Sequence, residues 1–90
     1  MEFIHSREYL NQGDVVEVSS DTPCNFMLTD ETNFSSFKRG ESFRYYGGFF
    51  KNFPARINVP HSGQWNITID LGAGSGHIRY GLRLIKAQSV

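Results

Sequence analysis

The chain has 90 residues, of which 39% are hydrophobic and 14% aromatic, and nine basic and nine acidic residues give it a formal net charge of zero. This length fits one domain, the composition excludes a disordered chain, and zero net charge excludes the strong positive field of a typical nucleic-acid-binding domain. We therefore predict a single domain over residues 1–90 with a thin core, in which aromatic rings supply much of the buried surface.

The first half of the chain predicts strands and one helical turn. A short strand is expected near residues 2–5, and residues 14–20 form a β-branched run after a turn at residues 11–13. Residues 24–29 predict the next strand, with Cys24, Phe26 and Leu28 on one side of it. Residues 30–39 then predict a helical turn, because Asp30 can cap it and Gly40 can end it.

The second half predicts strands only. Short strands are expected at residues 42–46 and 49–53 around Gly47 and Gly48, and another at residues 55–59. The clearest alternation covers residues 64–71 and 78–84, and the glycine-rich residues 72–76 between them predict a hairpin whose two strands share one core. The fold class is therefore all-β, a single small β-sandwich or partly open barrel of about seven or eight mostly antiparallel strands, with one short helical turn near residues 30–39.

Several short motifs resemble those of one known family. They occur in the same order over most of the chain: GDVVEV at residues 13–18, Asp30 with Asn33 and Phe34, YYGG at 45–48, VPHSGQW at 59–65, and IDLG at 69–72. In these motifs the chain is similar to the bacterial domain of unknown function 1883 family. The resemblance implies a compact β-rich domain and an accessory or sensing role beside signalling domains, and it implies no catalytic residue.

Charge and cysteine content bear on partners and compartment. Residues 1–31 hold seven acids and one base, a net charge of −6, and residues 32–90 hold eight bases and two acids, a net charge of +6. Either the second half forms a basic face, or the two halves interleave and neutralise each other, which we favour. A lone Cys24 excludes an intrachain disulfide, and the sequence has no apolar stretch typical of a signal peptide or membrane span. We expect a cytoplasmic protein without membrane contact.

Catalytic, cofactor and metal signatures are weak. Residues 72–76 precede a strand rather than a helix, so they predict a turn and not a phosphate-binding loop. The scattered histidines lack the spacing of a zinc site, Cys24 is expected to be a buried, inert thiol, and Trp65 a core anchor. We predict no catalytic residue, cofactor or metal. A small enzyme with a site near His61, Asp70 and His77 is the alternative.

The most suggestive segment combines rings and cations. Eight aromatic residues fall between residues 34 and 53, and paired neighbours must point to opposite faces of an extended strand. One ring of each pair is then either exposed as a functional surface or covered by residues 30–39. We predict a non-catalytic binding module that uses an aromatic and basic surface around residues 43–56. The candidate residues are Arg44, Tyr45, Tyr46, Phe49, Phe50 and Lys51. A protein or an anionic ligand is the expected partner, nucleic acid is less favoured, and a homo-oligomer interface is a further alternative.

Overall fold

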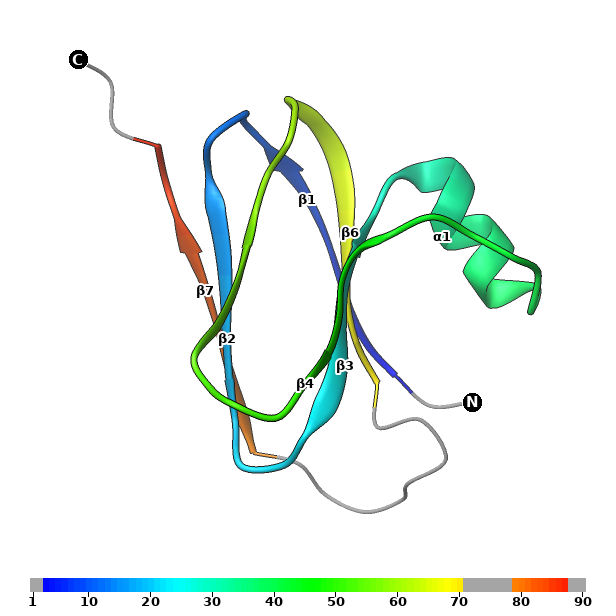
Figure 1. Ribbon diagram of the computed structural model, residues 1–90. Helices are drawn as coiled ribbons and strands as arrows, with labels where there is room; N and C mark the ends of the chain where they lie inside the picture. Colours follow the sequence, from blue (N-terminus) through cyan, green and yellow to red (C-terminus); the bar gives the residue numbers. More distant parts are fainter. Residues whose placement is uncertain (1–2, 71–78, 88–90) are drawn as a thin grey trace.

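The computed structural model describes residues 3–70 and 79–87, which form seven strands and one helix (Figure 1). In chain order these are β1 (Ile4–Leu10), β2 (Val15–Ser20), β3 (Cys24–Thr29), α1 (Glu31–Lys38), β4 (Tyr46–Phe50), β5 (Ala55–Asn58), β6 (Gly63–Asp70) and β7 (Tyr80–Ile85).

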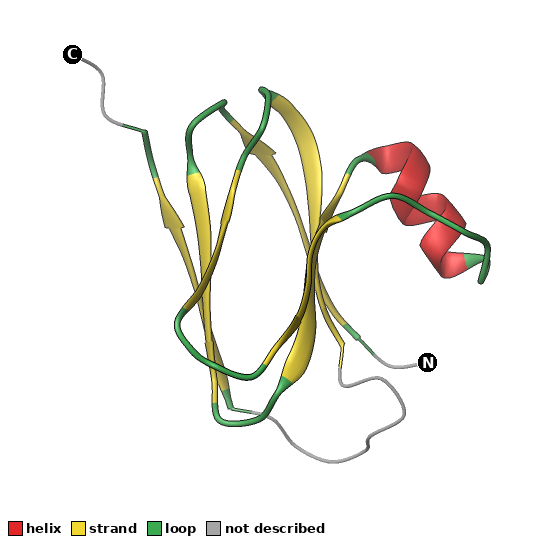
Figure 2. Cartoon of the chain, viewed as in Figure 1, coloured by secondary structure: helices red, strands yellow, loops and turns green. Residues whose placement is uncertain are grey.

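The strands form two antiparallel sheets that face each other. Sheet A has the order β1-β6-β3-β4 and sheet B the order β5-β2-β7. Figure 2 shows the two layers side by side, with the helix on the outer side of sheet A. The sheets do not close into a barrel, so the predicted all-β class is confirmed as an open sandwich.

Alternation along the strands builds the core between the sheets. On β6, Trp65, Ile67 and Ile69 are all less than 4% exposed and point toward sheet B, which contributes Val16 and Val18 from β2. The predicted burial of Trp65 is thus confirmed. The whole cluster comprises Leu10, Val16, Val18, Cys24, Phe26, Leu28, Ala55, Ile57, Val59, Trp65, Ile67 and Ile69.

The predicted hairpin between residues 64–71 and 78–84 is wrong. Strand β6 pairs with β1 and β3 in sheet A, whereas β7 pairs with β2 in sheet B. Both runs do face one core, since Leu82 and Leu84 of β7 pack against it. Alternation therefore predicted the buried face but not the pairing, because strands on opposite layers of a sandwich show the same period as hairpin partners. The glycine-rich residues 72–76 lie outside the described residues.

The helical turn predicted at residues 30–39 is confirmed as α1. Asp30 caps it, because its carboxylate accepts a hydrogen bond of 2.8 Å from the Asn33 backbone N–H. Phe34 and Phe37 pack from the helix onto Met27 of β3 and form a second apolar cluster outside the main core.

Polar side chains also join α1 to sheet A. The Asn66 side chain, 1% exposed on β6, donates to the Glu31 carboxylate at 2.9 Å and lies 2.7 Å from His5 Nε2. Arg7 on β1 pairs with the same carboxylate. These contacts lower the pKa of Glu31, mainly through the hydrogen bond from Asn66.

The two strands predicted at residues 42–46 and 49–53 are instead one strand, β4, with Gly47 and Gly48 inside it. The backbone at Gly47 has a positive φ of 104° and passes so close to β3 that a Cβ there would collide with the carbonyl oxygen of Phe26. Such a site requires glycine. The first strand is also longer than the predicted residues 2–5, since β1 extends to Leu10.

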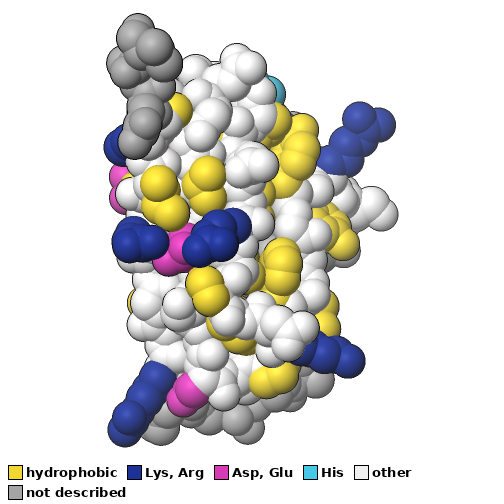
Figure 3. Space-filling view, turned by 60° about the vertical axis from the view of Figure 1, so that its left-hand side comes forward, with side chains coloured by type: hydrophobic (Ala, Val, Ile, Leu, Met, Phe, Trp, Pro, Cys, Tyr) yellow, Lys and Arg dark blue, Asp and Glu magenta, His cyan; other side chains and the backbone are white. Residues whose placement is uncertain are grey.

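Sheet B shows how the oppositely charged halves of the chain meet. Glu17 on β2 lies between Arg56 of β5, at 2.8 Å, and Arg83 of β7, at 3.2 Å. Figure 3 shows an acidic group flanked by two basic ones on this face. The hydrogen bond from Arg56 is the main cause of the lowered pKa of Glu17. The favoured interpretation, in which the two halves neutralise each other locally, is confirmed for these residues.

Candidate functional site

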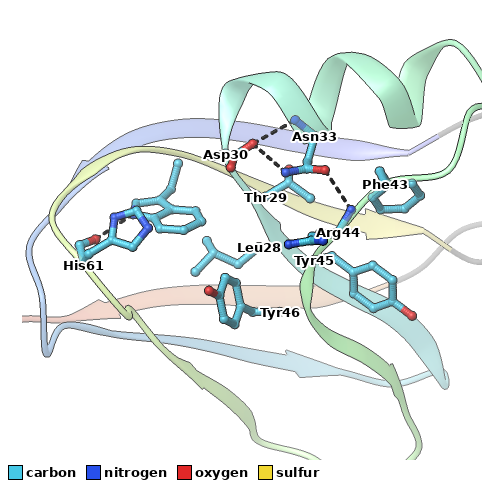
Figure 4. Close-up of a pocket in the computed structure, with 10 residues that line it drawn as sticks. Leu28, Thr29, Asp30, Asn33, Phe43, Arg44, Tyr45, Tyr46 and His61 are labelled. Carbon is cyan, nitrogen blue, oxygen red and sulfur yellow. Dashed lines mark hydrogen bonds between the residues drawn. The ribbon is translucent and has the colours of Figure 1, made fainter.

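A groove of about 580 Å³ opens at one end of the sandwich, between the start of α1 and the segment that leads into β4 (Figure 4). Its walls come from the end of β3, the cap of α1, residues 43–46 and the turn before β6. The lining residues are Leu28, Thr29, Asp30, Asn33, Phe43, Arg44, Tyr45, Tyr46, His61 and Trp65.

The groove has an aromatic corner built on Trp65. The indole N–H of this buried residue donates to the backbone carbonyl of His61 at 3.0 Å, so the turn and the ring hold each other in place. The His61 ring lies 4.9 Å from the indole, and Tyr46 meets it edge-on at 5.8 Å. Tyr46 is 47% exposed, so about half of its surface is open to solvent.

The opposite wall is fixed by hydrogen bonds from the helix cap. The Asn33 side chain donates to the Asp30 carboxylate at 2.9 Å, and its oxygen accepts the Arg44 backbone N–H at 2.8 Å. The start of α1 thus determines the path of residues 43–45, which have no regular structure. Both Arg44 and Tyr45 line the groove, and in Figure 4 the Arg44 side chain extends toward Leu28 whereas the Tyr45 ring points away from it.

The structure divides the six residues predicted for binding into three sets. Arg44, Tyr45 and Tyr46 meet at the groove. Phe49 lies further along β4 and is 58% exposed, and the exposed Lys51 follows the strand. Phe50 packs against the core, with its ring 5.7 Å from Phe26.

Strand alternation explains this division. In the register of sheet A, Tyr46 is opposite Leu28 and Phe50 is opposite Cys24, both of which belong to the core, whereas Phe49 is opposite the half-buried Asn25. Tyr46 stays partly exposed because it lies at the open end of the sandwich. Helix α1 covers another ring of the segment, Phe43, which packs 5.2 Å from Phe37. This segment therefore contains exposed rings, such as Phe49, and a ring that α1 covers, Phe43.

The sequence prediction of the binding surface did not include six residues of the groove: Leu28, Thr29, Asp30, Asn33, His61 and Trp65. Asp30 was identified only as a helix cap and Trp65 only as a core residue. No local pattern identifies the groove contact of Asn33, because its hydrogen bond to the Arg44 backbone N–H spans eleven residues. No local pattern brings residues 61–65 to this place, because they arrive through the pairing of β6 with β3.

Within the described residues, most basic side chains already have a partner. Ion pairs hold Arg7, Arg39, Arg56, Arg83 and Lys86. Lys38 lies over the Phe34 ring, and Arg79 interacts with Asp21. In this part of the chain the remaining basic side chains, Arg44 and Lys51, have neither an ion pair nor a side-chain hydrogen bond. Arg44 precedes β4 along the chain and Lys51 follows it.

The residues of the alternative enzyme site do not come together. His61 precedes β6 and Asp70 ends it, and the seven steps from Gly63 to Asp70 span about 23 Å at roughly 3.3 Å per residue. The third member, His77, lies outside the described residues. Over residues 3–70 and 79–87 no three His, Cys, Asp or Glu side chains are grouped as metal ligands, and no helix is long and apolar enough to cross a membrane.

The family comparison agrees with the motifs. The sequence model described as "Domain of unknown function (DUF1883)" matches residues 1–88. Neither the curated proteins nor the solved structures include a match to this chain. The family match covers nearly the whole sequence and includes every strand of the sandwich, and the chain belongs to the DUF1883 family.

Proposed function

We propose that this domain is a non-catalytic binding module for an anionic partner, which it contacts through the groove and the exposed side of β4. The observation that carries the proposal is the charge distribution of the described residues. There, Arg44 and Lys51 are the basic side chains left without a partner, and both lie beside exposed aromatic rings.

The rings next to these cations are suited to contact with a partner. Tyr45, Tyr46 and Phe49 are each between 47% and 58% exposed, although large apolar side chains are usually buried. Interfaces are enriched in tyrosine, phenylalanine and arginine, which offer a large contact area and charged hydrogen bonds. An acidic surface or segment of another protein would satisfy both features.

The experiment uses Trp65, the one tryptophan of the chain, as a reporter, because it lies in the corner of the groove. Poly-L-glutamate is titrated into the protein, and dextran serves as a neutral polymer. We expect poly-L-glutamate to change the fluorescence and dextran to leave it unchanged.

The charge variants then test the site. Replacing Arg44 and Lys51 together by alanine should weaken binding by about five- to thirtyfold, since two exposed ion pairs contribute about 0.5–1 kcal/mol each. The matched control is R39A, which removes one exposed cation that is already paired with Glu41. The proposal is wrong if poly-L-glutamate does not bind, or if the double variant and R39A behave alike.

A further inference from the structure

The four edge strands of the sandwich differ in how they are protected. An edge strand exposes unpaired backbone N–H and C=O groups, and proteins usually guard it with charged residues or proline. Strand β1 carries Arg7 and Glu8, β5 carries Arg56, and β7 carries Arg83. Strand β4 has the sequence YGGFF, without a charge or a proline. It is the unguarded edge of the described sheets.

The backbone of β4 is also accessible. The strand pairs with β3 on one side, and over residues 3–70 and 79–87 no other backbone hydrogen bond involves it. Every second N–H of a strand points to its other side. Gly47 and Gly48 have no side chains to shield these groups, and a Cβ at Gly48 would meet nothing within 4 Å. Glycines in a strand often mark a place where another backbone approaches closely.

Charge indicates what would pair with this edge. Arg44 lies two residues before β4 and Lys51 directly after it. An extended peptide along β4 would place its two ends near these cations. A second copy of β4 is a poorer partner, because antiparallel pairing centred on Gly48 would bring Arg44 of each copy close to Lys51 of the other, and like charges across strands are destabilising. The exposed rings of Tyr46 and Phe49 lie on opposite faces and would contact alternate side chains.

We infer that β4 is a docking edge for an extended acidic peptide, which adds to sheet A as a fifth strand. The inference rests on the proposed function, because it names the class of partner and the way it binds. In this mode the main-chain hydrogen bonds to β4 supply affinity, while Arg44, Lys51 and the exposed rings select acidic and apolar side chains.

The test begins with a library of random ten-residue peptides displayed on phage and selected on the whole protein. We expect the enriched peptides to carry acidic residues toward both ends and to lack a central proline. The best peptide is then synthesised in three forms: unmodified, N-methylated at its odd-numbered residues, and N-methylated at its even-numbered residues. The two methylated forms are called the two phases. N-methylation removes backbone donors on one edge only and preserves the charges and side chains.

Strand addition predicts that one methylated phase loses affinity roughly tenfold or more, since several backbone hydrogen bonds are lost, and that the other phase still binds. Amide hydrogen exchange should show that alternate amides of β4 gain protection when the peptide is bound. The double variant R44A/K51A should bind the unmodified peptide more weakly.

The contrary outcomes separate this inference from the proposed function. If both phases bind equally and the β4 amides are unchanged while R44A/K51A still weakens binding, strand addition is excluded and the anionic binding site remains. Enrichment of neutral or basic peptides contradicts both proposals. No enrichment excludes strand addition, and poly-L-glutamate then decides the proposed function alone. A dimer in light scattering with protected β4 amides would assign the edge to a second copy and overturn the inference.

Discussion

At Gly47 of β4, any side chain would collide with neighbouring atoms of the fold. A Cβ added there would overlap the Phe26 carbonyl oxygen and lie 2.7 Å from Cδ1 of Ile57, and the backbone has a φ of 104°. Because one of these neighbours is backbone of the central strand β3, a change of side-chain rotamer cannot relieve the overlap. We therefore expect G47A to destabilise the fold strongly.

The magnitude follows from two costs and one gain. A left-handed backbone costs an L-residue about 1–2 kcal/mol, and overpacking costs about 1–3 kcal/mol. Alanine gains about 0.4–1 kcal/mol because it restricts the unfolded chain. The net loss in the free energy of unfolding is then about 1–5 kcal/mol, with a central value of about 3 kcal/mol. A domain of this size has roughly 5–13 kcal/mol in total, so the variant should still fold.

Two other glycines serve as matched controls. Gly48, the next residue, has a positive φ of 144° but open space around its Cβ, so G48A should cost about 1–2 kcal/mol for the backbone and nothing for overpacking. Gly81 on β7 has open space and no positive φ, so G81A should change stability by less than about 1 kcal/mol.

Urea unfolding, followed by Trp65 fluorescence and far-ultraviolet circular dichroism, measures all three variants. The slope of the free energy against urea should stay constant, which shows that the surface exposed on unfolding is unchanged. If G47A is no less stable than G48A, then the backbone of β4 does not lie as close to β3 at Gly47 as described, and the reasoning about this strand is refuted.

The remaining predictions concern the helix cap, two carboxylates and the thiol. D30A should cost about 1 kcal/mol in urea unfolding, because the Asn33 N–H loses its acceptor; an unchanged midpoint would contradict the cap. Asp14 and Glu17 have lowered pKa values, mainly through the Ala87 backbone N–H and the Arg56 side chain respectively. The stabilisation that these two carboxylates give the fold is present above the ordinary carboxyl pKa of about 4, and it is lost as the pH falls through the lower folded-state pKa values. The melting temperature of the protein should therefore decrease as the pH is lowered from about 4. In D14N/E17Q this decrease should be less steep. Cys24 is fully buried and its pKa is raised by burial, so Ellman's reagent should react with it only after unfolding; fast reaction in the native protein would show that the thiol is accessible.

Much of the fold could be predicted because its signals are local. The alternation at residues 64–71 identified the face that carries Trp65 and Ile67, and Asp30 with Gly40 marked the ends of α1. Pairing could not be predicted in the same way. The partner of a strand is determined by which layer it joins, and β6 and β7 have the same pattern in different layers.

The groove could be predicted only in part for the same reason. Arg44, Tyr45 and Tyr46 are consecutive in the sequence, so composition alone drew attention to them. His61 reaches them through the pairing of distant strands, and Asn33 through a hydrogen bond between side chain and backbone across eleven residues. A composition-based search finds residues that are close along the chain and misses those that the fold brings together.

Packing explains only one of the two adjacent glycines of β4. Packing against Phe26 and Ile57 accounts for Gly47, because any side chain there would overlap its neighbours. It does not account for the absence of a side chain at Gly48, where a Cβ has open space, nor for the lack of a guarding charge along the strand. The positive φ of 144° accounts for the glycine at position 48, and an edge that must remain free for an approaching backbone accounts for the lack of a guarding charge. G48A should therefore lose only the backbone cost of about 1–2 kcal/mol in stability, which leaves the domain folded, and should clearly lose affinity for the selected peptide.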